Sequence, residues 1–169
     1  QDEALLKNTD VMVLCGDGPL IRTDTLAMML ERHTTTGAAA TLATARIKDP
    51  SGYGRIQRDA EGRFQKIVEQ KDATPEQLQI DEVNPSYYVF KADELFSRLS
   101  RLKNDNANGE YYITDVFELM NSDGLLIEVI DAVAAEDILS INNPDQLATV
   151  DSVLRQRMAT NLTEEGQHG

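Results

Sequence analysis

The stretch that decides the fold is "VMVLCGDGPL" at residues 11–20, an apolar run that stops abruptly at glycine, aspartate and proline. Such a run is typical of a fully buried strand, and Gly16, Gly18 and Pro19 end it sharply. Asp17 therefore lies at the mouth of a buried strand. It is either a turn aspartate that bonds its own backbone or a ligand for a metal ion or phosphate, placed where open α/β sheets bind ligands.

Strands and helices alternate along the rest of the chain. The patterns predict helices at 23–33, 92–102 and after Thr114, and strands at 38–47, 81–90, 125–132 and 136–141. Residues 53–70 indicate a β-hairpin excursion, and a long amphipathic helix follows Asn143. This order predicts a single α/β sheet, mostly parallel, with the hairpin at one side and the long helix at the C-terminal end.

Several local signals refine this prediction. Thr23 or Asp24 is expected to cap the first helix, which ends on His33 as a helix-end cation. Thr74 and Gln77 form a capping box that predicts a helix start. Proline after Asn84 interrupts a strand, so an edge or a bulge is expected there, with backbone freed beside Asn84.

The composition limits the class of protein. The 169 residues suffice for a domain with a real core, and the net charge of −13 argues against nucleic acid or an anionic membrane as partner. A phosphorylated small molecule stays possible, because a metal ion can bridge two negative partners. No apolar stretch is long enough to span a membrane, no secretion signal is readable and Cys15 is the single cysteine, so a cytoplasmic location is expected.

Conventional catalytic sets are not readable in the sequence. It shows no Ser-His-Asp arrangement and no Cys/His cluster with metal spacing. Polar residues at strand ends remain: Asp17 follows the first strand, and Asn142 follows the strand predicted at 136–141. Asn143 is explained as a helix N-cap, which leaves Asn142 without a capping role. Carboxylate and amide oxygens would suit a hard cation such as magnesium, although both residue types are also common in turns.

Six motifs carry a resemblance to a known family. They are "GDGPLI", "DPSGYGRI", "IVEQKDAT", "DEVN", "NDNANGEYYITDV" and "INNPDQL", in this order between Val11 and Leu147. Together they resemble the uridyltransferase (pyrophosphorylase) domain of the bacterial bifunctional N-acetylglucosamine-1-phosphate uridyltransferase/glucosamine-1-phosphate acetyltransferases. The resemblance implies a Rossmann-like nucleotidyltransferase sheet and a role in making a cell-wall (peptidoglycan) precursor. The implied reaction joins UTP and N-acetylglucosamine 1-phosphate to give UDP-N-acetylglucosamine and pyrophosphate.

The resemblance also implies roles for particular residues. Asp17 and Asn142 match the catalytic pair that holds magnesium. Gly54 matches a backbone contact to the sugar, and Glu69 and Asn84 match the residues that bond the N-acetylglucosamine hydroxyl and acetamido groups. Tyr112 and Thr114 match residues that line the sugar-phosphate side. Two departures concern the site: Cys15 replaces a frequent tyrosine, and Pro85-Ser86 stand where the family usually has threonine or serine and then glycine.

The resemblance covers part of the family's length. Residues 1–142 match the C-terminal two-thirds of the nucleotidyltransferase domain, and residues 143–169 match a helical arm toward an acetyltransferase domain that this sequence does not include. The family's N-terminal triphosphate-binding loop has no counterpart here, so the chain alone is expected to be inactive or nearly so and to self-associate through an unpaired sheet edge. The alternatives are another sugar-1-phosphate nucleotidyltransferase and a non-catalytic sugar-nucleotide binding or assembly fragment.

Overall fold

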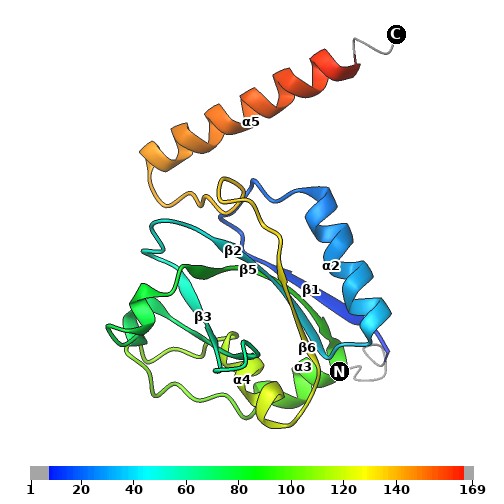
Figure 1. Cartoon of the computed structure of the whole chain (residues 1–169), viewed down its shortest axis with the longest axis vertical. Coiled ribbons are helices and arrows are strands. Elements are labelled where there is room, and N and C mark those ends of the chain that lie inside the picture. The colour runs from blue at the N-terminus through cyan, green and yellow to red at the C-terminus, as the bar shows by residue number, and fades with distance from the viewer. Residues whose placement is uncertain (1–7, 166–169) are drawn as a thin grey trace.

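The computed structural model describes residues 8–165, with side chains described through residue 160. Figure 1 shows a sheet flanked by helices, with one long helix lying across one end of the molecule. The strands are β1 (Asp10–Leu14), β2 (Ala40–Arg46), β3 (Gly54–Arg58), β4 (Phe64–Val68), β5 (Glu82–Lys91) and β6 (Ile127–Asp131). The helices are α2 (Thr23–Thr36), α3 (Ala92–Leu99), α4 (Asp115–Ser122) and α5 (Pro144–Glu165), with 3₁₀ turns η1 (Gln70–Asp72) and η2 (Gln77–Gln79).

The sheet is mixed, so the prediction of a mostly parallel sheet is wrong. Its order is β4-β3-β5-β2-β6, and β1 pairs with β5 beside this path. Strand β5 runs antiparallel to β1, β2 and β3, and among the described pairings only β2–β6 is parallel. Strands β1, β2 and β6 do run in one direction, as the alternation with helices predicted. The long strand β5 lies between β1 and β2 and separates them, which the pattern of elements alone does not reveal.

Strand β5 divides the core into two layers, because successive side chains of a strand point to opposite faces. Tyr87 and Val89 pack on the face with Met29 of α2. Tyr88 and Phe90 pack on the other face with Phe117 of α4, and their rings lie 5.0 Å from the Phe117 ring. The domain is therefore a three-layer α/β/α structure, as expected for strands buried on both faces.

On one of its edges, strand β5 pairs with β3 before Pro85 and with β1 after it. Before this residue Asn84 faces Gly54 of β3, and after it Tyr87 faces Leu14 of β1. Ser86 adopts the left-handed conformation, with φ at +64°, and its carbonyl accepts a hydrogen bond from the Cys15 amide at 3.2 Å. The irregularity predicted from Asn84-Pro85 is confirmed, and it leaves an opening between β1 and β3.

Helix α2 differs from the prediction at both ends. Arg22 occupies the N-cap position without a side-chain cap, whereas Thr23 or Asp24 was expected there, and Gly37 ends the helix at φ +67°. His33 is 1% exposed, and its Nδ1 lies 2.9 Å from the Thr41 hydroxyl. His33 is the basic residue of the last turn, as predicted, but burial lowers its pKa and so disfavours its charged form, although its Nε2 lies 3.4 Å from an Asp10 carboxylate oxygen.

The strand predicted at 136–141 is not formed. Residues 135–138 make a turn in which the Asp137 amide donates to the Ala134 carbonyl at 2.9 Å. The carbonyls of this segment accept side-chain rather than strand hydrogen bonds: the Tyr53 hydroxyl donates to Ile138, and the Tyr87 hydroxyl donates to Asp137. Ile138 is buried in the core as a strand residue would be, which explains why its apolar character was misread.

The hairpin and the smaller helix signals are largely confirmed. Strands β3 and β4 pair antiparallel, and Gly62 forms the turn at φ +79°. The capping box of Thr74 and Gln77 forms in both directions, at 2.8 and 3.3 Å, but it precedes only the short turn η2. Thr114 is the N-cap residue of α4, yet its hydroxyl is used elsewhere, as described below.

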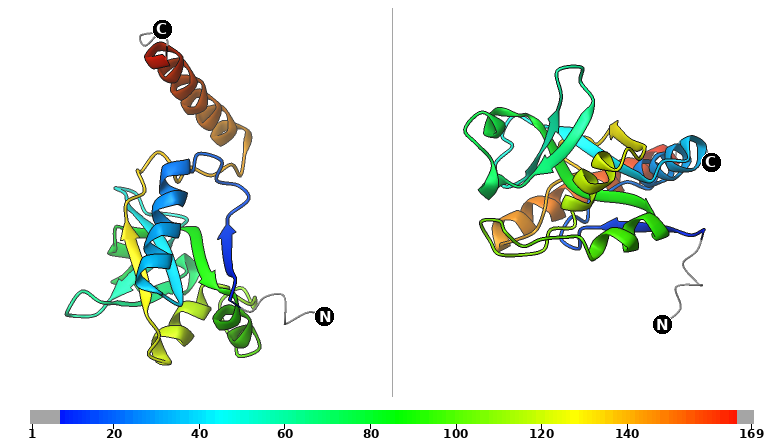
Figure 2. Two further views of the ribbon diagram at one scale, coloured as in Figure 1. Left: turned by 90° about the vertical axis from the view of Figure 1, so that its right-hand side faces the viewer. Right: turned by 90° about the horizontal axis from the view of Figure 1, so that it is seen from below.

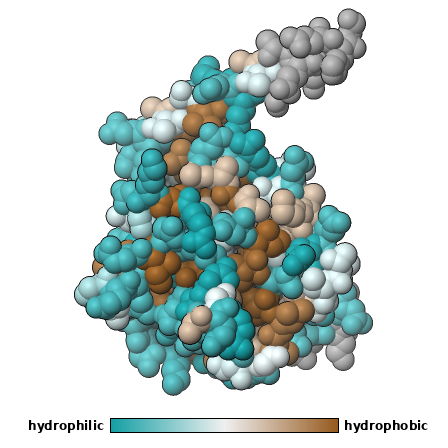
Figure 3. All heavy atoms as spheres, in the orientation of Figure 1, coloured by the Kyte–Doolittle hydropathy of each residue, from teal (hydrophilic) through white to brown (hydrophobic). Residues whose placement is uncertain are grey.

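Helix α5 projects from one end of the domain, as the views in Figure 2 show. The Asn143 side chain accepts from the Gln146 amide at 2.9 Å, which confirms its capping role. The predicted division into residues 1–142 and an arm at 143–169 stays a prediction, and residues 166–169 lie outside the described part. Figure 3 shows apolar patches among polar residues on one face of the molecule. No contact of the described residues identifies what would cover these patches, so self-association also stays a prediction.

Candidate functional site

The opening beside the irregularity in β5 is a cavity of about 240 Å³. Its walls come from segments far apart in the sequence: residues 15–17, 52–54, 69, 84–86 and 138–142. The lining residues are Cys15, Asp17, Gly52, Tyr53, Gly54, Glu69, Asn84, Pro85, Ser86, Ile138, Ser140 and Asn142. All of the predicted site residues except Tyr112 and Thr114 thus line a single cavity. Their roles in binding or catalysis stay predictions.

Gly54 and Glu69 face one another across one wall. A Cβ atom built on Gly54 would lie 3.0 Å from Ile67 Cγ2 and 3.4 and 3.5 Å from the two carboxylate oxygens of Glu69. Gly54 is the first residue of β3, and Glu69 directly follows β4, so the hairpin itself brings the two together. A larger residue would press on Ile67 here, and the absence of a side chain at Gly54 leaves space in front of the Glu69 carboxylate.

Asn84 lies opposite Gly54 in the strand register and is 5% exposed. Its side-chain nitrogen donates to the Tyr88 hydroxyl at 2.7 Å, and its side-chain oxygen accepts from the Ser86 amide at 3.1 Å. These bonds hold the irregular turn of β5 in place. Asn84 therefore shapes the cavity wall, and a ligand would compete with the Ser86 amide for its side-chain oxygen.

Asp17 and Asn142 line the same cavity from adjacent loops. The Ile141 amide donates to the Asp17 carbonyl at 2.9 Å, which holds the two segments side by side. The Asn142 side-chain nitrogen donates to the Ser140 hydroxyl at 3.1 Å. Asn142 follows no strand, so its predicted place at a strand end is wrong. That its side-chain oxygen and the Asp17 carboxylate share one magnesium ion stays a prediction.

The side-chain oxygens of Asp17 and Asn142 are of the chemical type that binds magnesium. Asp17 is exposed, and no arginine or lysine of the described residues forms an ion pair with it. The Asn142 amide uses its nitrogen toward Ser140, which leaves its oxygen for another partner. Magnesium is typically held by one or two protein oxygens and by substrate phosphates. Among the side chains described, residues 8–160, no three His, Cys, Asp or Glu gather into a metal centre, so any ion here would depend on ligand oxygens as well.

Tyr112 and Thr114 line a neighbouring hollow of about 390 Å³ that shares Cys15, Glu69 and Ser86 with the first. The Thr114 hydroxyl donates to Glu69 Oε1 at 2.9 Å, which links the start of α4 to the cavity wall. The Tyr112 hydroxyl is buried and has no hydrogen-bond partner in the described part of the chain. Glu69 thus stands at the junction of the two hollows.

Tyr53, Ser86 and Ser140 also line the cavity, and sequence reasoning missed them. Tyr53 lies between Gly52 and Gly54, and its hydroxyl donates to the Ile138 carbonyl at 2.8 Å across the cavity floor. Burial raises the pKa of Tyr53, so it stays a neutral donor. The sequence signal that could have identified Tyr53 is an aromatic residue between two glycines. Glycines make a loop flexible, so an aromatic side chain between them indicates an anchor that holds the loop in one conformation.

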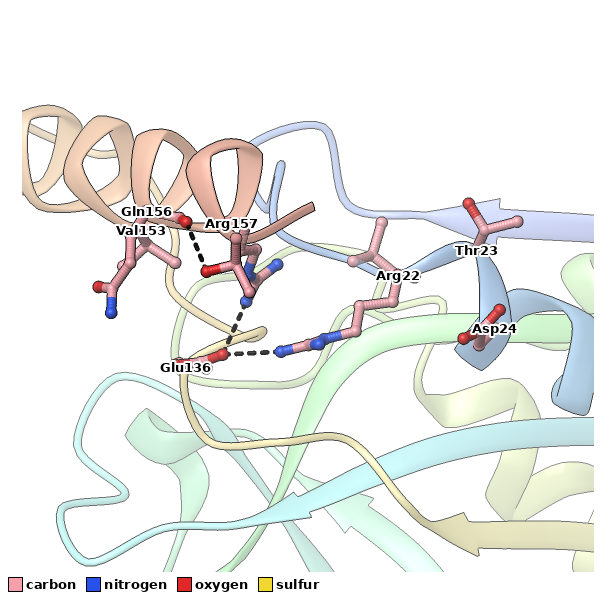
Figure 4. Close-up of a pocket in the computed structure, with 9 residues that line it drawn as sticks. Arg22, Thr23, Asp24, Glu136, Val153, Gln156 and Arg157 are labelled. Atoms are coloured by element: carbon pink, nitrogen blue, oxygen red, sulfur yellow. Dashed lines mark hydrogen bonds and ion pairs between the residues drawn. The ribbon is translucent and has the colours of Figure 1, made fainter. Parts of the chain in front are cut away.

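A larger hollow of about 690 Å³ lies under helix α5 (Figure 4). It holds none of the predicted site residues. Arg22 and Arg157 both point to Glu136, at 2.7 and 3.2 Å, and both also pair with Asp137, whose side chain is 3% exposed. Because these charges satisfy one another, we interpret this hollow as the joint between α5 and the body of the domain.

The chain belongs to the nucleotidyl transferase family, because the sequence model of that family matches residues 1–158. Among curated proteins, it is 45% identical over 156 residues to a Pelotomaculum thermopropionicum protein named "Bifunctional protein GlmU". It is 41% identical over 155 residues to the Geobacillus thermodenitrificans protein of the same name. These alignments cover 92% of this chain but 34% of the relatives, so the chain spans about a third of the length of these relatives.

Solved structures show the same fold. The structure of apo UDP-glucose pyrophosphorylase superposes with a TM-score of 0.60 at 17% identity, covering 92% of this chain and 57% of that one. The structure of UDP-glucose pyrophosphorylase complexed with UDP-glucose gives a TM-score of 0.55, also at 17% identity, covering 76% and 51%. At this identity the likeness establishes the nucleotidyltransferase fold and nothing finer. In residues 8–165, no helix combines the length and the apolar character needed to cross a membrane.

Proposed function

We propose that this chain carries the sugar-phosphate half of a site that makes UDP-N-acetylglucosamine and pyrophosphate from UTP and N-acetylglucosamine 1-phosphate. One observation carries the proposal: Asp17, Gly54, Glu69, Asn84 and Asn142, which come from segments far apart in the sequence, line a single cavity. The family membership and the relatives named "Bifunctional protein GlmU" support the reaction class.

The sugar is assigned to the wall formed by Gly54 and Glu69. The Glu69 carboxylate accepts one bond from Thr114 and keeps further acceptor positions for sugar hydroxyl groups. A hydrogen bond to a charged group contributes about 1.5–3 kcal/mol, more than a bond between neutral groups. Asn84 lies beside this wall, where its amide can meet the acetamido group once a ligand displaces the Ser86 contact.

Asp17 and Asn142 are assigned to magnesium. When bound, the ion would offset negative charge on the phosphate groups and favour in-line displacement at the α-phosphorus. The attacking phosphate oxygen is already ionised, so no protein side chain has to act as a general base. The remaining contribution of the chain is to orient the sugar phosphate, and orientation alone can account for a large share of a rate enhancement.

The chain tested by itself is expected to turn over very slowly. Among the described residues, the cavity lining includes no lysine or arginine to meet a triphosphate. Losing even one positioned electrostatic donor typically costs about a hundredfold in rate. A pyrophosphate-release assay with UTP, N-acetylglucosamine 1-phosphate and magnesium tests this directly. Turnover near the enzyme median of about 10 per second would contradict the expectation.

Binding is the sharper test of the site itself. Calorimetric titration with UDP-N-acetylglucosamine should show magnesium-dependent binding that Asp17→Ala abolishes. UDP-glucose serves as the matched ligand, since it lacks the acetamido group. Equal affinity for the two would favour another sugar-1-phosphate nucleotidyltransferase. No binding of either would favour an assembly fragment and would defeat the proposal for this chain.

A further inference from the structure

Among the described residues, Arg55 is the largest side chain that is fully buried, at 2% exposure. It follows Gly54 on strand β3, directly behind the cavity wall. Its guanidinium donates to the Tyr53 carbonyl and, at 3.4 Å, to Oε1 of Gln70. Its Nε has no hydrogen-bond partner in the described part of the chain.

The half-buried Arg58 and the buried Arg98 are paired differently. Arg58 forks onto Glu82 at 2.7 and 2.8 Å, and Arg98 pairs with Glu94 and Asp123 at 2.6 and 2.7 Å. Arg55 forms an ion pair with no carboxylate of the described residues. Burial lowers its pKa, but a guanidinium stays charged at neutral pH. A buried cation that lacks a carboxylate destabilises a fold, so the position calls for a reason other than stability.

The contacts of Arg55 supply that reason. Oε1 of Gln70 also accepts a hydrogen bond from the Gly52 amide, so Arg55 and Gly52 share one acceptor. Through Tyr53 and Gln70 the guanidinium ties the loop at 52–54 to the segment that follows Glu69. These two segments carry the facing groups of the sugar wall, Gly54 and the Glu69 carboxylate.

We propose that Arg55 is a positioning residue for sugar recognition, which fixes the separation between Gly54 and Glu69 by joining Tyr53 to Gln70. The inference rests on the proposed function for its ligand, and on the hydrogen bonds alone for its effect on the wall. The fork of the guanidinium is what the position requires, because an ammonium is a single point donor and cannot hold both acceptors in the same geometry.

The test compares Arg55→Lys with Arg98→Lys, a matched control in which another buried arginine, on α3 and outside the cavity lining, loses its fork. Hydrogen–deuterium exchange of the ligand-free chain should show the Gly52 and Gly54 amides exchanging about tenfold faster in Arg55→Lys than in Arg98→Lys. Calorimetry should show N-acetylglucosamine 1-phosphate binding about tenfold more weakly in Arg55→Lys, as expected when a supporting residue is removed, and unchanged in Arg98→Lys.

The two readouts separate the failure of this inference from that of the proposed function. Unchanged exchange at Gly52 and Gly54 in Arg55→Lys overturns the positioning role whatever the ligand does. Faster exchange without sugar-phosphate binding by the unsubstituted chain leaves the positioning of the loop supported and the proposed function refuted. Should Arg55→Lys fail to fold, Gln70→Ala removes the shared acceptor from a half-buried position, and faster exchange is then expected at the Gly54 amide, because the Gly52 amide loses its own acceptor in this variant and is not informative. Unchanged exchange at Gly54 would overturn the positioning role.

Discussion

Replacing Gly54 by alanine isolates the sugar wall from the stability of the fold. The added methyl group would lie 3.0 Å from Ile67 Cγ2, whereas carbon atoms pack best at about 3.5–4.0 Å, so the wall must yield by roughly 0.5 Å. Such overpacking costs about 1 kcal/mol at the low end of its range. Alanine also restricts the unfolded chain, which stabilises the folded state by about 0.4–1 kcal/mol. This gain applies here because Gly54 does not have a positive φ, so alanine can adopt its backbone conformation. The free energy of unfolding should therefore change by less than about 1 kcal/mol.

Ligand binding should change much more. The same methyl group would lie 3.4 and 3.5 Å from the two oxygens of Glu69, in the space that a sugar hydroxyl needs to reach the carboxylate. Losing one hydrogen bond to a charged acceptor costs about 1.5–3 kcal/mol, which corresponds to about a tenfold to hundredfold loss of affinity.

The assay is calorimetric titration of UDP-N-acetylglucosamine in magnesium, together with denaturant unfolding of each variant. Gly16→Ala is the matched control, since a Cβ there meets no atom within 4 Å and the residue is not part of the cavity lining. If Gly54→Ala bound the ligand as tightly as Gly16→Ala, the assignment of the sugar to this wall would be refuted.

Further substitutions test the remaining features. Asp17→Asn keeps the size of the side chain but removes its charge, so the tightening of ligand binding by magnesium should fall by at least about tenfold in titrations with and without the ion. Ser86→Gly should raise the free energy of unfolding by about 0.5–1 kcal/mol. The left-handed conformation of Ser86 costs a non-glycine residue about 1–2 kcal/mol, and the extra unfolded-chain entropy of glycine offsets only part of the gain from removing that cost. Lower stability in urea unfolding would contradict this. The pKa of Glu82 is lowered: burial would raise it, but the hydrogen bonds from Arg58 and Thr44 outweigh burial. The carboxylate of Glu82 should stabilise the fold fully above the ordinary glutamate pKa of about 4.3, and this stabilisation should be lost as the pH falls through the lower pKa of the folded chain. Glu82→Gln should therefore be less stable than the unsubstituted chain at pH 7 and nearly equal to it in acid.

The sequence predicts the elements better than it predicts their pairing. The strand in the run at 11–15, the hairpin turn at Gly62 and the cap at Asn143 are local signals, and the structure has all three. The prediction that the first strand is fully buried is wrong, because β1 pairs with β5 alone among the described strands, and its Leu14 is 40% exposed. The antiparallel insertion of β5 between β1 and β2 depends on contacts across the whole chain, which no local pattern encodes. The segment ending in Ile138 was misread because burial produces the same apolar character in a strand and in an anchored turn.

The candidate site was foreseen as a set of residues more than as a geometry. Their positions after predicted strands suggested Asp17 and Asn142, and the family resemblance implied Gly54, Glu69 and Asn84; the structure places all five around one cavity. The supporting contacts were not foreseen, because the bonds of Tyr53 to Ile138 and of Arg55 to Gln70 join residues whose relation appears only after folding. Residues that hold a site in shape have no signature of their own in a single sequence.

The position of the cavity follows from the change of neighbours along β5. A strand that is paired on both sides leaves no backbone group for a ligand, and a strand that lacks one neighbour exposes a whole edge. Asn84 is the last residue of β5 paired with β3, and Tyr87 is the first paired with β1, so the opening at Pro85–Ser86 is short and closed at both ends. The Asn84 side chain satisfies the Ser86 amide within this gap, and the Ser86 carbonyl is satisfied by Cys15. The gap is thereby stable without a ligand, and the segments that end beside it, carrying Asp17, Gly54 and Glu69, can present their side chains or backbone to it without having to complete the sheet.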